Sequence, residues 1–189
     1  MTDSEIIGLI LQGDRDKFRI LVEKYQQMVF RTCMGFVHNK DDADDLTQDV
    51  LIQAYQSLQA FKGAASFSTW IYRIAINASL NKVRKSTGNH ILQRLDILFG
   101  AGKEKEIALP LLDAENPENI LIRQEHKDWV KKALDSLPEK QRTAIVLSNY
   151  DDLSQKEIAE IMDTTEGAVE ALIQRAKSNL RKKLTSSHK

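Results

Sequence analysis

Aromatic and basic side chains, the two types that bind unpaired bases and their backbone, alternate within one segment of the chain, residues 61–85. The segment contains Phe61, Lys62, Phe67, Trp70, Tyr72 and Arg73. An aromatic face stacks on a base for about 1 to 3 kcal/mol, while cations follow the phosphates. The small residues from Gly63 to Ser66 leave room for an extruded base. The alternative is that Phe67 and Trp70 belong to the hydrophobic core.

An acidic segment lies immediately before the basic one. Its aspartates are Asp41, Asp42, Asp44, Asp45 and Asp49, with no basic residue among them. No acidic residue then follows between Val50 and Leu95. Two oppositely charged patches so close together suggest two different partners. Since the aspartates lack the alternating spacing and glycine of a calcium loop, we interpret them as solvated or partner-facing charges.

These aspartates open a helix that we predict from about Asp41 to Leu58, because acids in a first turn complement the helix dipole. The helix carries two apolar faces. One consists of Leu46, Val50, Ala54 and Leu58, and the other of Leu51, Ile52 and Tyr55 beside Gln48 and Asp49. One face can pack on a core, and a second apolar strip rimmed by acids is typical of a partner surface. Burial of both faces in a compact cluster of helices is the alternative.

The most informative local motif lies near the C-terminus. Ser154 and Glu157 form a capping box, and residues 163–165 form a short polar turn before a last helix. A short helix, a tight turn and a longer helix make a helix-turn-helix candidate. After Glu170 every charged residue is basic, namely Arg175, Lys177, Arg181, Lys182, Lys183 and Lys189. Such cations neutralise phosphates; the alternatives are a packed helical hairpin and a solvated helix end.

No pattern in the chain predicts an enzyme. The histidines are scattered and without metal-ligand spacing, at His38, His90, His126 and His188. Neither a glycine-rich phosphate loop nor a nucleophile elbow is present. The single cysteine, Cys33, lies within an apolar stripe and is interpreted as a small buried hydrophobe. We therefore predict no catalytic residue, no metal and no cofactor.

Composition predicts an all-α protein. Only 8 glycines and 3 prolines occur in 189 residues, and 42% of the residues are hydrophobic. The chain therefore has few of the residues that form turns between strands. The net charge of zero is uninformative about polyanionic partners. No apolar run reaches the roughly 18 residues that span a bilayer, and the N-terminus lacks a signal-peptide pattern. We expect no membrane insertion and a cytoplasmic location.

Helical periodicity divides the chain into two small helical domains joined by a flexible linker. Helices are predicted at 17–37, 41–58 and 67–85, and again from residue 120 onward. The stretch 86–123 breaks this rhythm with prolines and glycines, although 91–99 could form a short helix. We predict domains at 1–90 and 123–189, with the linker at 91–122.

Three motifs in the correct order resemble a bacterial extracytoplasmic-function sigma factor of the sigma-70 superfamily. They lie at residues 41–63, 67–85 and 135–184, so the resemblance covers nearly the whole chain. It implies a subunit that joins core RNA polymerase and directs promoter-specific initiation without itself catalysing a reaction. It also implies control by an anti-sigma factor that masks the polymerase face.

The resemblance assigns three sets of residues. The polymerase-binding positions are Asp45, Gln48, Asp49, Leu51, Ile52 and Tyr55. The positions for the minus-ten element, which is read as melted DNA, are Lys62, Gly63, Ser66, Phe67, Ser68, Thr69, Trp70, Tyr72, Arg73, Asn77 and Asn81. The positions for the minus-thirty-five duplex are Thr165, Glu166, Gly167, Ala168, Glu170, Ala171, Gln174, Arg175 and Lys177.

The recognition helix departs from the usual family pattern. Glu170, Ala171 and Leu172 stand where relatives commonly place basic or hydroxyl side chains. Glutamate repels phosphate but accepts a hydrogen bond from the amino group of cytosine, so base preference should shift. Asp163 replaces the common turn glycine, and aspartate tolerates left-handed backbone better than most residues.

Two other functions compete with the sigma factor. A stand-alone helix-turn-helix regulator would bind palindromic duplex as a dimer, without polymerase. A protein-binding adaptor would be indifferent to charge reversal at Arg175, Lys177 and Arg181. The sigma factor requires core polymerase to hold its two DNA-binding modules at a fixed separation.

Overall fold

A computed structural model describes residues 1–98 and 129–186, with side chains described outside 86–98 and 186. The elements are α1 (Asp3–Leu11), η1 (Arg15–Lys17), α2 (Phe18–Val37), α3 (Lys40–Gln56), η2 (Leu58–Ala60), α4 (Phe67–Leu98), a helical stretch at 129–135, α6 (Glu139–Tyr150), α7 (Gln155–Met162) and α8 (Glu166–Ser186). Within the described residues there is no strand, which confirms the all-α prediction. Most of the expected linker, 99–122, lies outside the described residues.

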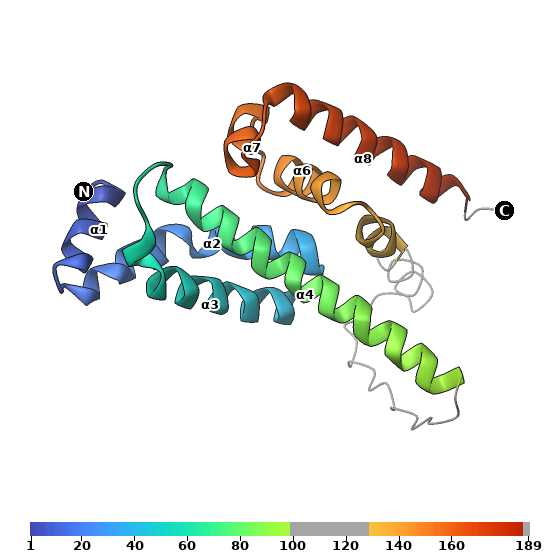
Figure 1. Ribbon diagram of the computed structural model, residues 1–189, viewed down its shortest axis with the longest axis horizontal. Coiled ribbons are helices and arrows are strands. Elements are labelled where there is room, and N and C mark those ends of the chain that lie inside the picture. Colours follow the sequence, from blue (N-terminus) through green and yellow to red (C-terminus); the bar gives the residue numbers. More distant parts are fainter. Residues whose placement is uncertain (99–128, 187–189) are drawn as a thin grey trace, which may run out of the picture.

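The N-terminal half packs α1, α2, α3 and the first part of α4 around one core (Figure 1). The core contains Leu21, Val29, Val50, Leu58 and Ile71, all essentially inaccessible to solvent. Because the buried residues of α2 and of α3 recur three and four positions apart, each of these helices presents one apolar stripe inward. The predicted first face of α3 thus lies in the core.

Local signals fix the ends of these helices. Helix α1 was not predicted, although Thr2 and Glu5 form a reciprocal capping box that marks its start. Helix α2 ends at His38 in a left-handed conformation, and the Asn39 side chain then accepts from the Asp42 amide at 3.0 Å to cap α3. Two helices therefore follow each other with almost no loop.

Helix α4 is longer than the segment predicted at 67–85. It starts at Phe67, where Ser66 Oγ accepts from the Thr69 amide at 3.1 Å, and continues to Leu98. Residues 91–98 of the short helix expected at 91–99 are therefore a continuation of α4, and residue 99 lies outside the described residues. A lone Gly88 costs a helix only about 1 kcal/mol, whereas a proline would have ended it.

The C-terminal half consists of residues 129–135, α6, α7 and α8. Buried Arg142 of α6 donates through Nε to the Leu134 carbonyl at 3.1 Å, which ties the preceding helical residues to α6. Asp163 ends α7 at φ 52° and ψ 56°, so the expected left-handed aspartate is present at the turn. Val169, Ile173 and Ala176 then pack the inner face of α8.

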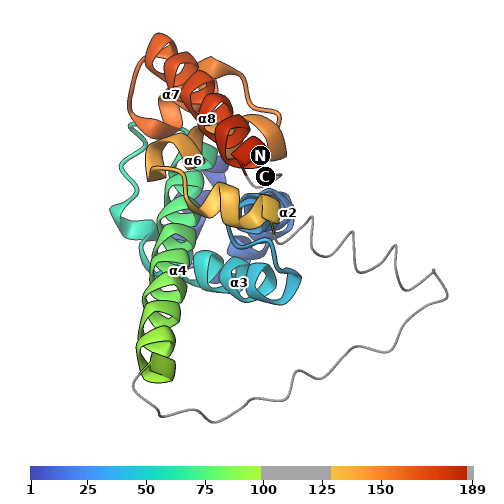
Figure 2. The same cartoon turned by 90° about the vertical axis from the view of Figure 1, so that its right-hand side faces the viewer.

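The two halves lie against each other. Helices α6, α7 and α8 run along one side of α2 and α4 in two perpendicular views (Figures 1 and 2). A second apolar cluster joins Phe36, Tyr72 and Ile76 of the N-terminal half to Leu147 and Ile158 of the C-terminal half. The chain thus buries a core within its first half and another between its halves.

Candidate functional site

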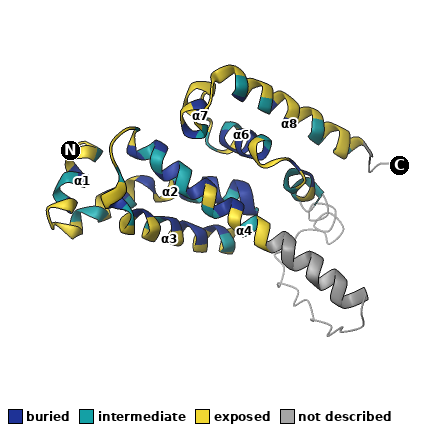
Figure 3. Cartoon of the chain, viewed as in Figure 1, coloured by how far each residue is buried: buried dark blue, intermediate teal, exposed yellow. Residues whose placement is uncertain are grey.

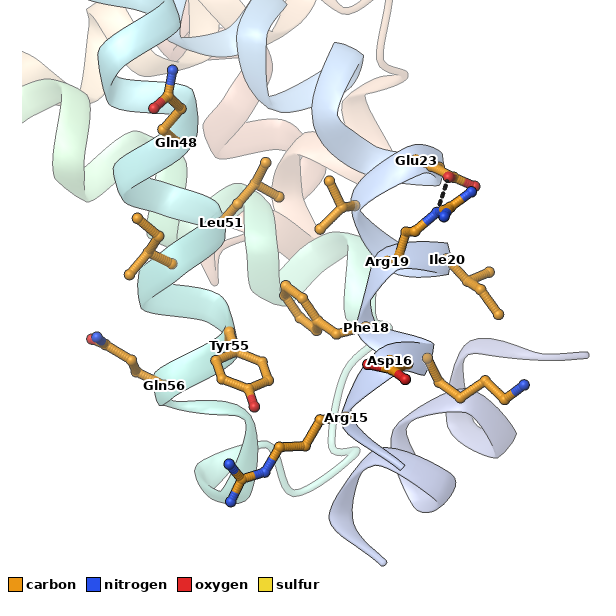
Figure 4. Close-up of a pocket in the computed structure, with 13 residues that line it drawn as sticks. Arg15, Asp16, Phe18, Arg19, Ile20, Glu23, Gln48, Leu51, Tyr55 and Gln56 are labelled. Atoms are coloured by element: carbon orange, nitrogen blue, oxygen red, sulfur yellow. Dashed lines mark hydrogen bonds and ion pairs between the residues drawn. The ribbon is translucent and has the colours of Figure 1, made fainter. Parts of the chain in front are cut away.

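An open groove runs between the start of α2 and the end of α3 (Figure 4). It has a volume of about 1120 Å³ and its lining includes Phe18, Ile20, Leu51, Ile52 and Tyr55. Ile52 is 55% exposed and Tyr55 is 38% exposed, although both are large apolar side chains. The second face of α3 is therefore not buried in a compact cluster, and the α2–α3 groove has the character of a docking surface.

The α2 wall of the groove was not predicted from the sequence. Phe18 of α2 points toward Leu51 and Tyr55 of α3, whereas Ile20, which also lines the groove, lies on the side of α2 away from α3 (Figure 4). Ile20 is 38% exposed and lies outside the apolar stripe of its helix. The position of Ile20 outside the apolar stripe, next to basic Arg19, could have indicated an exposed apolar surface on α2.

An acidic rim adjoins the groove on α3. Asp44, Asp45 and Asp49 are exposed there, and Gln48 lines the groove itself. The pKa of Lys82 on α4 is raised, first by its hydrogen bond to Asp42 at 2.8 Å and also by the charges of Asp45 and Asp49. The aspartates of the rim thus stabilise the charged form of Lys82. All six predicted polymerase-binding residues lie on α3 beside the groove.

The loop 61–66 is anchored by aromatic rings at both ends. The Phe67 ring lies 5.8 Å from Phe61 and 5.5 Å from Trp70, between ring centroids, and 5.3 Å from Tyr25 of α2. Phe67 is buried, whereas Phe61 and Trp70 are half-buried. The sequence left core and stacking roles open; in this structure Phe67 belongs to the core and Trp70 keeps part of its surface.

The tip of this loop is open to solvent. Lys62, Gly63, Ala64 and Ser66 are exposed, and Gly63 adopts a φ of 69°, which favours glycine. Ser66 Oγ lies 2.8 Å from Ser68 Oγ and also caps α4. The loop therefore presents small residues and the cation Lys62 next to the packed aromatic rings.

The predicted minus-ten residues that follow on α4 are divided between surface and interior. Asn77 and Asn81 are exposed, and Asn81 accepts from Arg84 Nη1 at 3.2 Å. Tyr72 is only 6% exposed, and burial raises the pKa of its phenol. Arg73 donates to backbone carbonyls of α7.

The outer face of α8 is exposed along its first three turns (Figure 3). Exposed residues there include Thr165, Glu166, Gly167, Glu170, Ala171, Gln174, Arg175 and Lys177, while Ala168 is half-buried. Arg175 donates through Nε to the Ala171 carbonyl at 3.1 Å. The capping box at Ser154 fixes the start of α7, with the Ser154 amide donating to Glu157 at 2.9 Å. This helix-turn-helix presents an exposed face with a basic flank.

Two family models match the chain in the order of these surfaces. Sigma-70 region 2 matches residues 21–88, and Sigma-70, region 4 matches residues 127–180. The ECF RNA polymerase sigma-E factor of Haemophilus influenzae is 33% identical over 184 residues, which cover 97% of this chain and 96% of the relative. The chain belongs to the ECF RNA polymerase sigma factors. The resemblance derived from the motifs is thereby confirmed.

Other members of the ECF sigma factor family are similarly related. The RNA polymerase sigma-H factor of Pseudomonas aeruginosa is 33% identical over 186 residues, covering 96% of this chain and 93% of the relative. The Escherichia coli K12 sigma-E factor is 34% identical over 184 residues, covering 97% of this chain and 95% of the relative. Both relatives share nearly the full length of this ECF sigma factor.

Solved structures show that the fold is shared. CnrH, in complex with the cytosolic domain of CnrY, superposes with a TM-score of 0.63 at 22% identity, covering 97% of both chains. RpoE of Bartonella quintana, in complex with the anti-sigma factor NepR, gives a TM-score of 0.56 at 21% identity, covering 89% of this chain and 96% of that one. Among the described helices of this ECF sigma factor, none has the length and apolar character to cross a membrane.

Proposed function

We propose that this sigma factor binds core RNA polymerase through the α2–α3 groove and the adjoining aspartates. The observation that carries the proposal is the exposure of Ile52 and Tyr55 within the region 2 match, beside Asp45 and Asp49. An apolar groove with aspartates along its α3 side fits a partner surface that has apolar ridges and places basic residues against α3. The chain itself contributes binding and positioning rather than a chemical reaction.

The loop 61–66 and the start of α4 serve the melted minus-ten element in this proposal. Small residues at the exposed tip admit an extruded base, and Lys62 supplies charge for the backbone. The ring cluster around Phe67 holds both ends of the loop. The loop therefore loses little conformational entropy when a base binds. Base capture then offsets part of the cost of opening the duplex.

The outer face of α8 reads the minus-thirty-five duplex. Gln174 and Arg175 project from the exposed face, and Lys177 adds a phosphate contact. Glu170 would accept from a cytosine amino group in the major groove, which sets the base preference apart from that of relatives with basic residues there. Because each module binds weakly alone, core polymerase provides the fixed separation that lets both act together.

An anti-sigma factor and a cytoplasmic location complete the proposal. CnrH was solved with CnrY, and the Bartonella quintana RpoE with NepR. We extend a partner of this kind to the present chain, with the exposed α2–α3 groove as the surface that it would cover. Core polymerase and promoter DNA place the active form in the cytoplasm.

Transcription with purified core polymerase and genomic fragments tests the proposal. We expect transcripts with defined starts only when core polymerase and the chain are both present. A gel shift without core polymerase separates the main rival, because a stand-alone regulator would bind duplex tightly by itself. Intact protein that binds core polymerase but yields no defined start would contradict the proposal.

A further inference from the structure

The carboxylate of Asp3, in the first turn of α1, holds two side chains of α2. Tyr25 Oη donates to Asp3 Oδ2 at 2.5 Å, and Lys24 Nζ donates to Asp3 Oδ1 at 2.6 Å. Burial tends to raise the pKa of the Asp3 carboxyl, but the hydrogen bonds from Lys24 and Tyr25 outweigh burial and lower the pKa. Asp3 is therefore a charged acceptor, and its hydrogen bond from the Tyr25 hydroxyl is charge-assisted.

Tyr25 carries this contact into the interior of the first half. The residue is only 7% exposed, and its ring centroid lies 5.3 Å from that of Phe67, with the two planes inclined by 59°. Because the hydroxyl is bonded at the far end of the ring, the Tyr25 ring cannot swing without breaking the bond to Asp3. Aromatic pairs depend on the mutual orientation of their rings. Asp3 therefore fixes the surface on which Phe67 packs.

Phe67 in turn contacts a ring at each end of the loop 61–66. Its centroid lies 5.8 Å from that of Phe61, at the start of the loop, and 5.5 Å from that of Trp70, in the first turn of α4. Phe61 and Trp70 also contact each other, with centroids 5.3 Å apart. A displacement of the Phe67 ring would therefore move both ends of the loop.

The competing explanation is that Asp3 only attaches α1 to α2. Lys24 separates the two explanations, because it bonds the same carboxylate from the same helix. Its side chain is 52% exposed, and its ammonium lies 5.1 Å from the centre of the Tyr25 ring. Lys24 thus helps to attach α1, but it does not hold the buried hydroxyl of Tyr25.

We propose that Asp3 and Tyr25 are positioning residues for base capture: their hydrogen bond orients the Phe67 ring and thereby sets the shape of the loop 61–66. This inference rests on the proposed function, because it takes the loop as the minus-ten surface. Both residues lie outside the minus-ten set assigned from the sequence, which begins at Lys62. A loop held in its binding shape loses less conformational entropy when it takes up a base, so the pair should raise the affinity for melted DNA.

The fluorescence of Trp70 reports on the ring cluster in the free, full-length chain. The chain has two tryptophans, so Trp129→Phe leaves Trp70 as the only one. In this background, Asp3→Ala and Tyr25→Phe should both shift the Trp70 emission to longer wavelength and increase its quenching by acrylamide. Asp3→Asn keeps an acceptor oxygen and should restore the parent spectrum. A residue that only attaches α1 would cost stability without moving the spectrum of a folded variant.

The holoenzyme measures the effect on DNA. Each variant is assembled with excess core polymerase, and its binding of a randomised single-stranded DNA pool is compared with that of core polymerase alone. Asp3→Ala and Tyr25→Phe should each weaken this binding about two- to tenfold, the range that one aromatic contact is worth. The double variant should bind no more weakly than either single variant, because both changes remove one interaction.

Two comparisons keep this effect separate from other losses. The affinity for core polymerase should stay unchanged, because neither Asp3 nor Tyr25 lines the α2–α3 groove. Lys24→Gln is the matched control and should behave as the parent does in both assays. Circular dichroism verifies folding. If Asp3→Ala does not fold, Tyr25→Phe decides, since it keeps the ring and removes only the hydroxyl.

Three results would overturn the proposal. The first is a parent-like Trp70 spectrum in folded Tyr25→Phe, and the second is parent-like DNA binding by that variant. The third is a loss in Lys24→Gln as large as that in Asp3→Ala, which would make Asp3 an attachment point of α1 only. A parent holoenzyme that binds no more of the pool than core polymerase alone would instead refute the proposed function of the loop. The Trp70 spectra would then still show whether Asp3 and Tyr25 orient the rings.

Discussion

The Phe18 ring of α2 stands edge-on to the Tyr55 ring of α3, with centroids 5.0 Å apart and planes inclined by 62°. This pair closes the floor of the α2–α3 groove at the ends of two helices (Figure 4). An edge-to-face pair holds both rings in one orientation, which preorganises an exposed surface before a partner arrives. The shape of the groove is therefore fixed by packed side chains in the free protein.

Replacing both rings measures this coupling. A double-mutant cycle with Phe18→Leu and Tyr55→Leu should give an interaction energy of about 0.5 to 1.5 kcal/mol in the free energy of unfolding. Urea unfolding of the four proteins provides the measurement. Strictly additive losses would show that the rings act independently.

The basic flank of α8 should contribute through released counterions. Lys177 is exposed beside the reading face, so Lys177→Gln should lower the slope of log affinity against log salt by about one for a random-sequence duplex. Arg19→Gln, in the other half and 83% exposed, is the control. An unchanged slope for Lys177→Gln would remove this residue from the DNA surface.

The turn of the helix-turn-helix depends on backbone that most residues avoid. Asp163 has a φ of 52° and ends α7. Asp163→Val should lower the free energy of unfolding by about 1 to 2 kcal/mol, whereas Asp163→Asn should change it little, because asparagine also tolerates left-handed backbone. Thermal or urea unfolding decides. Equal stability of the valine and asparagine variants would contradict the assignment of strain to this position.

Acidification should first separate the two halves, from the closed arrangement of this structure to an open one, through His38. Burial lowers the pKa of His38 in the closed form, with the charges of Lys131 and Arg142 adding to the effect and Asp135 opposing it. Opening restores a pKa of about 6.5, so the open form binds the extra proton as the pH falls from about 7.5 to about 5.5. Energy transfer between dyes attached at Gln26→Cys on α2 and Ser178→Cys on α8, two exposed positions, should show the distance between the dyes lengthening over this range.

Asp151 acts in the opposite direction at lower pH. Burial raises the pKa of its carboxyl in the closed form, against the hydrogen bond from Thr32 and the charge of Arg31, while Asp152 adds to the rise. Protonation of Asp151 therefore favours closure. His38→Asn, which tolerates the left-handed backbone at the end of α2, should abolish only the opening limb. A parent profile that matches that of His38→Asn would exclude His38.

Local sequence patterns were sufficient to predict most helices and the exposed apolar face of α3. The predicted helix at 17–37 corresponds to Phe18–Val37, and the two apolar faces of α3 separate into a buried and an exposed one. Helical periodicity reports which residues face a core because it depends on one helix at a time. The alternative that both faces of α3 are buried is wrong for this structure.

Features that depend on two distant segments escaped prediction. The groove needs Phe18 from α2 as well as Tyr55 from α3, and the sequence pointed only to the second. The closure of the two halves depends on Gly35 meeting Val146, more than a hundred positions away. Periodicity carries no information about which apolar faces meet, and an isolated glycine in a helix gives no sign of its neighbour.

The affinity of core polymerase for a groove variant shows whether the α2–α3 groove binds the polymerase. Loss of a buried isoleucine contact is worth about 1.5 to 3 kcal/mol, so Ile52→Ser combined with Asp49→Lys should weaken core binding by about tenfold or more. Gln53→Ser, exposed on the same helix but outside the groove, should bind as the parent does. Equal affinities for the folded double variant and the parent would show that the groove does not bind core polymerase.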